Sequence, residues 1–340
     1  LLANTTGVRN TAVGQAAGIA LTTGNDNTLI GQDSGDSITT GTQNVAVGSE
    51  ALQATTTADN NVAVGFSAGL VNTTGTNNTF IGSLSGDANT TGNNNVSVGK
   101  SSLSANTTGS SGTAVGKSAL GANTTGAQNT AVGESCLATN TTGASNTAVG
   151  FTALFANTTG ASSTAVGYEA LLSATTANSN TAVGKAALRT VTTGTENIAV
   201  GVHALYNNTG SYNTVMGTEA GVTQTSGDNN TFLGRRSGYN NTTADNNTAV
   251  GFQSLLSNTT GTANVAIGYN AAASVTTGSS NIAIGYQALQ DTLATTTGTT
   301  NIGIGVNVRT KSASESGSII IGHDIETSAV NSFTFGTSAQ

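Results

Sequence analysis

A Val/Ile-Gly dipeptide returns every 17 residues through most of this 340-residue chain, and this period constrains the fold more than any other feature. The repeated glycines make eleven consecutive steps of 17 from Gly14 to Gly201, and later steps of 16, 20 and 14 end at Gly217, Gly305 and Gly336. A unit this short cannot bury a core of its own, so each copy must be stabilised by stacking on its neighbours. The period therefore predicts one repeat array of twenty units rather than several globular domains.

Composition argues against several classes of protein. Only 7% of residues are charged, the net charge is −7, and the nine basic residues are scattered, so we expect no nucleic-acid partner. No apolar run approaches the ~20 residues of a transmembrane helix, so we expect no membrane insertion. The single cysteine, Cys136, excludes an internal disulfide and occupies a position where other units carry Ala or Ser, which favours a packing role.

Each unit begins with a short block that has the pattern of a β-strand. In the unit formed by residues 129–145, the block Asn-Thr-Ala-Val-Gly is rich in β-branched residues. The remainder predicts a second short strand, typified by Ala119 and Leu120, and then a turn written Asn-Thr-Thr-Gly. A helix is excluded by two glycines per unit and many β-branched or Asn residues. The recurring Asn at the start of the block can form a ladder of side-chain hydrogen bonds.

The two faces of the predicted strand differ in side-chain size. The residues flanking the middle of the block, such as Thr130 and Val132, project to one face, which we assign to the interior of the coil. The middle residue then faces outward, yet it is mostly Ala. An outward column of Ala implies a second buried surface, and we expect a subunit contact in a homotrimer. The interface residues of this prediction are Ala131, Ala148, Ala165 and Ala182.

These patterns predict an all-β fold, a parallel β-solenoid of about 20 coils with a 17-residue repeat. At ~4.8 Å per coil, twenty coils would extend on the order of 90 Å. We expect a regular solenoid over residues 1–305 and irregular terminal coils or a cap over residues 306–340, where side chains become larger and more charged. The step of 16 places a missing residue in the turn at 206–210, and the step of 20 places three extra residues around 291–297. The strands that begin near Asn213 and Asn301 should stay in register.

The blocks "NNVAVG", "NTAVG", "NIAIG" and "GSIIIG" resemble those of trimeric autotransporter adhesin heads of the YadA-like type. That resemblance implies a left-handed parallel β-roll with three chains packed side by side. The longer form "ALxxNTTGxxNTAVG" also resembles repeat regions of phage tail fibres. The adhesin-head unit is about three residues shorter than most units here, and the extra length falls in the Asn-Thr-Thr-Gly turn.

Few residues converge in a way that suggests catalysis, and we expect no enzyme, no metal site and no cofactor. His203 and His323 lie seven coils apart, and no triad or metal-ligand spacing occurs. Asp228 and Asp245 hold the same position in adjacent units, which would suit a glycosidase or a calcium site, but solvated turn formers are the simpler interpretation. N-glycosylation sequons of the form Asn-X-Thr recur because the Asn-Thr-Thr-Gly turn recurs. Their asparagines are Asn72, Asn89, Asn106, Asn123, Asn140, Asn157 and Asn258.

The residue after the repeat glycine is aromatic in several consecutive units. The simple interpretation is a stacked ladder, and the functional one is an exposed strip that binds sugar rings. The candidate ligand-binding residues are Phe252, Tyr269, Tyr286, Phe151 and Tyr168.

Together these features predict a structural or adhesive fibre shaft, either in a virion tail fibre or at a bacterial surface. Its partners would be two further copies of itself and possible contacts to a host-cell surface glycan or protein. The alternatives are a glycan-binding solenoid and an ice-binding solenoid, the latter through paired Thr columns such as Thr141-Thr142 and Thr158-Thr159.

Overall fold

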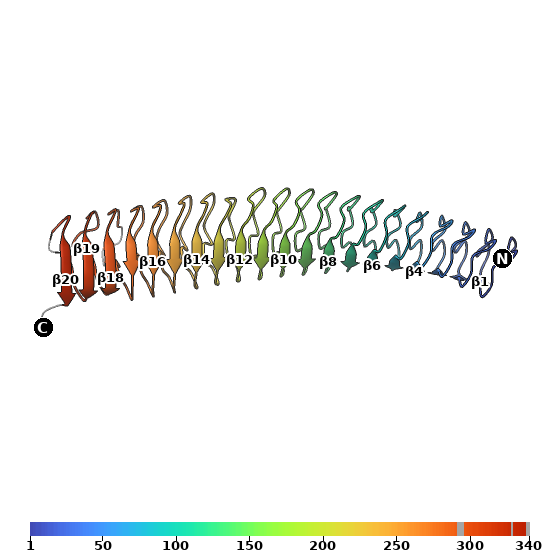
Figure 1. Ribbon diagram of the computed structural model, residues 1–340, viewed down its shortest axis with the longest axis horizontal. Helices are drawn as coiled ribbons and strands as arrows, with labels where there is room; N and C mark the ends of the chain where they lie inside the picture. Colours follow the sequence, from blue (N-terminus) through green and yellow to red (C-terminus); the bar gives the residue numbers. More distant parts are fainter. Residues whose placement is uncertain (291–295, 328, 338–340) are drawn as a thin grey trace. The chain divides into compact units, whose positions relative to one another are not determined.

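The computed structural model describes residues 1–290, 296–327 and 329–337, and its fold is an all-β parallel β-solenoid with about 19 turns in total. These turns are distributed over two compact units, Leu1–Thr176 and Ala177–Gln340, each with one strand per coil (Figure 1). The strands of the first unit are β1 (Thr11–Val13), β2 (Thr28–Ile30), β3 (Val45–Val47), β4 (Val62–Val64), β5 (Thr79–Ile81), β6 (Val96–Val98), β7 (Thr113–Val115), β8 (Thr130–Val132), β9 (Thr147–Val149) and β10 (Thr164–Val166). Those of the second unit are β11 (Thr181–Val183), β12 (Ile198–Val200), β13 (Thr214–Met216), β14 (Thr231–Leu233), β15 (Thr248–Val250), β16 (Val265–Ile267), β17 (Ile282–Ile284), β18 (Ile302–Val306), β19 (Ile319–His323) and β20 (Phe333–Thr337).

Within each unit, every strand pairs in parallel with the next strand along the chain. In the regular coils the partners are 17 residues apart, as in Ala114 with Ala131. The two irregular steps also pair the middle residue of one strand with the middle residue of the next, since Ala199 pairs with Val215 and Ala283 pairs with Gly303. The prediction that the strands stay in register is therefore confirmed. The extra residues of the longer step fall largely in 291–295, outside the described residues.

The predicted second strand is wrong. Residues 117–122 form turns, and the backbone there alternates into the left-handed region, with φ of 57° at Ser118 and 51° at Leu120. Two such residues per coil bend the chain too sharply for an extended strand. Successive coils remain hydrogen-bonded across this segment, since the Leu120 N–H donates to the carbonyl of Cys136 at 3.0 Å.

The two faces of the strand are reversed relative to the prediction. The middle residues Ala131, Ala148, Ala165 and Ala182 are each 0% exposed and lie inside the coil, so the prediction that they form a subunit contact is wrong. The flanking residues point outward, and Val132 is 37% exposed. The physical reason lies in the opposite wall, where the fourth residue after the repeat glycine, usually Leu as in Leu137, is also fully buried. A leucine from that wall leaves room for only a small side chain on the strand.

Three coils show that the two walls share one fixed volume. The middle residue is large at Leu29, Phe80 and Phe232, and all three side chains are fully buried. At each of these places the wall position, the fourth residue after the repeat glycine and leucine in most other coils, is glycine both in the same coil and in the coil before it. These glycine pairs are Gly18 and Gly35, Gly69 and Gly86, and Gly221 and Gly238.

Space, rather than backbone conformation, requires glycine at these wall positions. A Cβ atom at Gly238 would lie 2.6 Å from Cε2 of Phe232, and one at Gly69 would lie 2.7 Å from Cδ2 of Phe80. The φ of Gly238 is 57°, close to the 53° of Leu255 at the wall position of the next coil. Because leucine adopts the same backbone conformation there, only the neighbouring ring excludes it at position 238.

Two ladders of buried Asn side chains run along the coils. In the predicted ladder at the start of the strand block, Asn27 Oδ1 accepts from the Asn44 backbone N–H at 3.0 Å, and Asn44 Nδ2 donates to the carbonyl of Ala58 at 2.8 Å. The second ladder consists of the sequon residues, as in Asn89 Nδ2 donating to Asn72 Oδ1 at 2.7 Å. These sequon amides are buried, so they are closed to glycosylation in the folded chain. The hydrogen bonds satisfy most of these amide groups, which would otherwise be costly to bury, although Asn157 Oδ1 and Asn258 Oδ1 lack a partner among the described residues.

Candidate functional site

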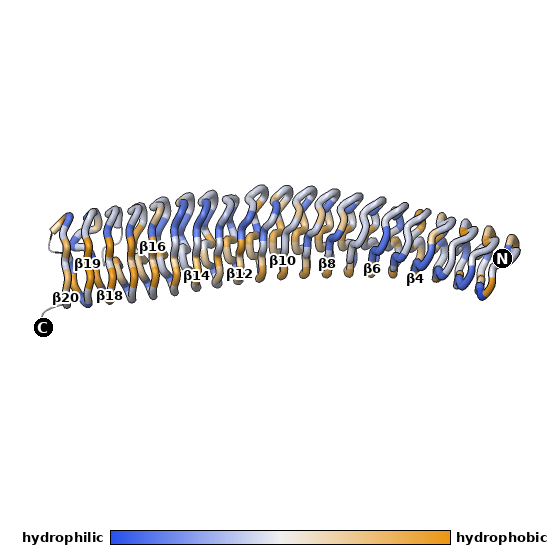
Figure 2. The backbone as a smooth tube through the Cα atoms, viewed as in Figure 1, coloured by the Kyte–Doolittle hydropathy of each residue, from blue (hydrophilic) through white to orange (hydrophobic). Residues whose placement is uncertain are grey.

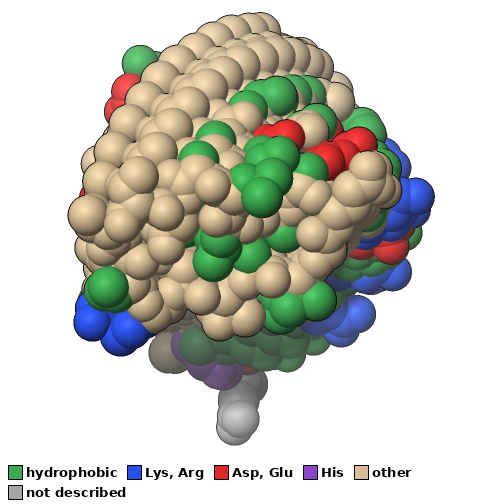
Figure 3. Space-filling view, turned by 90° about the vertical axis from the view of Figure 1, so that its right-hand side faces the viewer, with side chains coloured by type: hydrophobic (Ala, Val, Ile, Leu, Met, Phe, Trp, Pro, Cys, Tyr) green, Lys and Arg blue, Asp and Glu red, His purple; other side chains and the backbone are tan. Residues whose placement is uncertain are grey.

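The outward face of the strands is a regular surface in each unit. In β1–β10 its two columns contain only Thr, Val and Ile. Figure 2 shows hydrophobic stretches at the strands of many coils, with hydrophilic stretches close to them in the first coils. The most exposed of its apolar residues in this unit are Val13, Ile30, Ile81, Val96, Val115, Val132 and Val149, at 36–59%. Figure 3 shows the end of the first unit, where neutral side chains and backbone cover most of the visible surface and most charged side chains lie toward one side of the view. An uncharged, partly apolar surface that continues over ten strands is typical of an interaction surface.

The aromatic residues after the repeat glycines stack as the simple interpretation predicts. The ring centroids of Phe252 and Tyr269 are 5.3 Å apart, those of Tyr269 and Tyr286 are 5.2 Å apart, and the interplanar angles are 14° and 7°. In the first unit, Phe151 and Tyr168 stack at 5.7 Å and 12°. The guanidinium of Arg235 lies 5.8 Å from the ring centroid of Phe252. Both ring faces of Tyr269 are therefore covered by neighbouring rings, whereas Tyr286 is stacked on one face, and these two residues remain 44% and 48% exposed.

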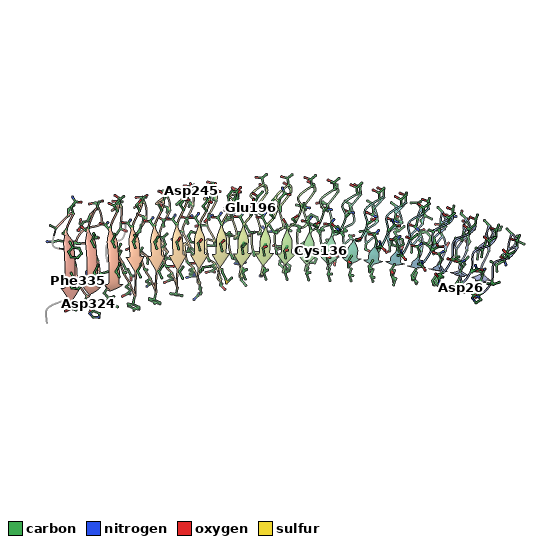
Figure 4. All side chains as sticks on the ribbon, viewed as in Figure 1. Asp26, Cys136, Glu196, Asp245, Asp324 and Phe335 are labelled. Carbon is green, nitrogen blue, oxygen red and sulfur yellow. The ribbon has the colours of Figure 1, made fainter. Side chains whose placement is uncertain are left out.

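The paired carboxylates serve the backbone at a corner of the coil. Asp245 Oδ1 accepts from the Asp228 N–H at 2.7 Å, and Asp228 Oδ1 accepts from the Ser211 N–H at 2.6 Å. Asp245 lies at the turn end of its coil, away from the strands (Figure 4). Among the described residues, no group of three or more His, Cys, Asp or Glu side chains could hold a metal ion. The two histidines are not brought together, since His203 packs edge-on against Tyr206 and His323 lies beside Asp324.

The Thr pairs of the turn do not form a two-column flat face. The Thr141 hydroxyl donates to the carbonyl of Thr158 at 2.9 Å, and that of Thr158 donates to Thr175 at 3.1 Å. This first column is half-buried and hydrogen-bonded to the backbone, so only the second column, with Thr142 and Thr159, is exposed. Sequence reasoning missed the other Thr column, on the outward strand face, because it assigned that face to the interior.

Cys136 is fully buried, and its thiol donates to the carbonyl of Gly150 at 3.2 Å. Burial raises the pKa of this thiol from its ordinary value of 9.0 to about 11. Its environment matches the packing role inferred from the sequence.

We expect the Cys136 thiol of the native chain to resist Ellman's reagent at pH 8 and to react within seconds after denaturation, because both burial and the raised pKa suppress the reactive thiolate. Since the folded-state pKa is the higher one, this thiol leaves stability unchanged below about pH 9 and lowers it between about pH 9 and pH 11. A matched Cys136→Ala variant should lack that loss. Rapid labelling of the native chain at pH 8 would contradict the burial.

Comparison of the chain with known protein families, with curated proteins and with solved structures finds no match. Across the residues that the structure describes, no helix is long and apolar enough to cross a membrane.

Proposed function

We propose that this chain is the structural shaft of a fibre that self-associates as a homotrimer, in a phage tail fibre or a bacterial surface adhesin. The observation that carries the proposal is the uncharged outward strand face, which repeats with the period of the coils. The function is mechanical and adhesive rather than enzymatic.

The coils of each unit are suited to bearing load along the stack. Main-chain hydrogen bonds join successive coils at the strand, as in the Thr130 N–H donating to the carbonyl of Asn146 at 2.8 Å, and also at the turns. The two Asn ladders add side-chain bonds in the same direction, as in Asn140 Nδ2 donating to Asn123 Oδ1 at 2.8 Å. Stretching a unit would require many of these bonds to break together, which supports a role as a stiff spacer.

The outward strand face supports a second copy of the chain as its partner. Ten strands at about 4.8 Å, each three residues long at about 3.3 Å per residue, give a face of roughly 480 Å² in the first unit. A standard stable interface buries ~800 Å² on each partner, so the proposed contact draws on the strand faces of both units. A partner with the same period can match the Thr and Val columns over the whole length, and threefold closure would leave none of these faces exposed.

Replacing Val132, Val149 and Val166 together by Asp should convert the chain into a folded monomer, because three carboxylates per copy would be desolvated in the interface. Sedimentation equilibrium gives the mass, and far-UV circular dichroism checks the fold. The matched control is Ala127→Asp with Ala144→Asp, at the corner position where other coils carry Asp228 and Asp245. A trimer that persists in the strand-face variant, or dissociates equally in the corner control, would place the interface elsewhere.

Ice binding is the second candidate function, and one observation favours it. Thr113, Thr130, Thr147 and Thr164 form an outward column on four consecutive strands, beside the column of Val115, Val132, Val149 and Val166. Hydroxyl and methyl groups thus alternate on a regular surface with a spacing of about 4.8 Å. Thermal hysteresis, the gap between the melting and freezing points of a solution of the isolated chain, decides the question. A gap no larger than that of a protein that does not bind ice, at the same concentration, would exclude this candidate.

A further inference from the structure

A groove crosses the three coils that carry β15, β16 and β17. It has a volume of about 260 Å³ and is lined by Gln253, Leu256, Ser257, Asn270, Ala273 and Gln290, together with Ser274. The first residue after each repeat glycine in these coils is a member of the Phe252–Tyr269–Tyr286 ladder, so groove and ladder occupy the same coils. Gln253 and Asn270 directly follow Phe252 and Tyr269 in the chain.

A small side chain among larger neighbours contributes to this opening. Ala273 is the fifth residue after its repeat glycine, a position that we call the groove position. The other stacked aromatic pair, Phe151 with Tyr168, lies in coils whose groove positions hold Phe155 and Leu172. Replacing those large residues by the methyl group of Ala273 leaves an opening beside Leu256.

The lining of the groove is polar but carries no charge. Its side chains are amides, hydroxyls and aliphatic groups, all half-buried except the buried Ala273. Asn270 Oδ1 and Gln290 Oε1 are buried and have no hydrogen-bond partner among the described residues. Buried acceptors without a donor are costly, and two ligand hydroxyls could each donate to one of these atoms once the amide side chains rotate toward the groove.

We propose that this groove binds a neutral oligosaccharide along the side of the shaft. Sugar hydroxyls donate to Asn270 Oδ1 and Gln290 Oε1, while Leu256 and Ala273 contact the less polar face of a sugar ring. Tyr269 and Tyr286, which are 44% and 48% exposed in the same coils, offer two phenolic hydroxyls to a sugar chain that extends beyond the groove. A charged ligand would find no counter-ion in the lining. This binding activity goes beyond the structural role and does not depend on the number of copies in the fibre.

The test uses the whole chain and four probes: maltohexaose, cellohexaose, chitohexaose and, as a charged comparison, a hyaluronan hexasaccharide. Binding is measured by saturation-transfer difference NMR and by titration of tyrosine fluorescence. We expect at least one neutral probe to bind. Ala273→Leu should fill the groove and weaken that binding about ten-fold or more.

The matched control is Ala138→Leu, which adds the same side chain at the groove position of a coil without an aromatic ladder. Circular dichroism verifies that both variants are folded. A second variant, Asn270→Leu, should also weaken binding, because it removes an acceptor without changing the ladder. The proposal is overturned if no neutral probe binds, if hyaluronan alone binds, or if Ala273→Leu and Ala138→Leu have equal effects. Sedimentation of the same samples tests self-association separately, so failure of one proposal is distinguishable from failure of the other.

Discussion

Replacing Gly238 by Leu should destabilise the second unit by about 1 to 3 kcal/mol or more, although leucine is the commonest residue at this position of the repeat. The ring of Phe232 already fills the space, since a Cβ atom at Gly238 would lie 2.6 Å from its Cε2 atom. The variant Phe232→Ala alone should cost about 3 to 5 kcal/mol through the cavity that it leaves.

The double variant should lose less stability than the sum of the losses in the two single variants, because the new leucine fills the space of the lost ring. We expect a coupling energy within the range of about 0.5 to 3 kcal/mol that contacting residues show. Urea denaturation followed by circular dichroism measures all three variants. The control is Gly238→Ala, which adds one carbon and should cost less than Gly238→Leu. Strictly additive costs would mean that these two positions do not share one volume.

Replacing Ala148 by Asp should strongly destabilise the first unit. Its side chain is 0% exposed, so the carboxylate would be buried without a partner, at a cost of about 3 to 5 kcal/mol or more. The neighbouring change Val149→Asp places the same group on the outward face, where Val149 is 36% exposed, and should change the stability of the monomer by less than about 1 kcal/mol.

Thermal unfolding of the two variants, measured at concentrations low enough to separate the copies, compares the two faces directly. The adjacent positions share backbone conformation and strand propensity, so each serves as the control for the other. If Val149→Asp unfolds the chain and Ala148→Asp does not, the faces are those expected from the sequence rather than those of the structure.

The period alone predicted the architecture, because a 17-residue unit has no way to bury apolar residues except by stacking. The register of Ala199 with Val215 and of Ala283 with Gly303 followed from the same argument, since a one-residue slip would turn each strand over. The Asn ladder was also predictable, because a repeated amide at one corner has its own copies as its nearest partners.

The faces of the strand were not predictable from alternation. Thr130, Ala131 and Val132 are all compatible with burial. The alternation along the strand therefore separates larger from smaller side chains, not polar from apolar ones, and does not show which face is buried. The side that faces inward is decided by Leu137 on the opposite wall, whose φ of 50° is a conformation that sequence rules reserve for glycine, Asn or Asp. The same positive φ at Ser118 and Leu120 explains why the second strand was predicted wrongly.

One signal in the sequence could have corrected the faces. Where the middle residue is Phe80 or Phe232, glycine replaces leucine at the wall position of the same coil and of the coil before it. These glycines are Gly69, Gly86, Gly221 and Gly238. Such compensation in volume is expected only between side chains that meet inside a packed core. The groove had no comparable signal, because Ala273 is an ordinary residue in this repeat and only its neighbours make it an opening.

The mass of the unmodified chain in solution tests the central claim, self-association through the outward strand face, most directly. Each copy has a mass of 33.2 kDa, so sedimentation equilibrium should give three times that mass, about 100 kDa, across a hundred-fold range of concentration. A folded species of 33.2 kDa over the same range would contradict the account, because the uncharged face of every strand would then remain exposed to water.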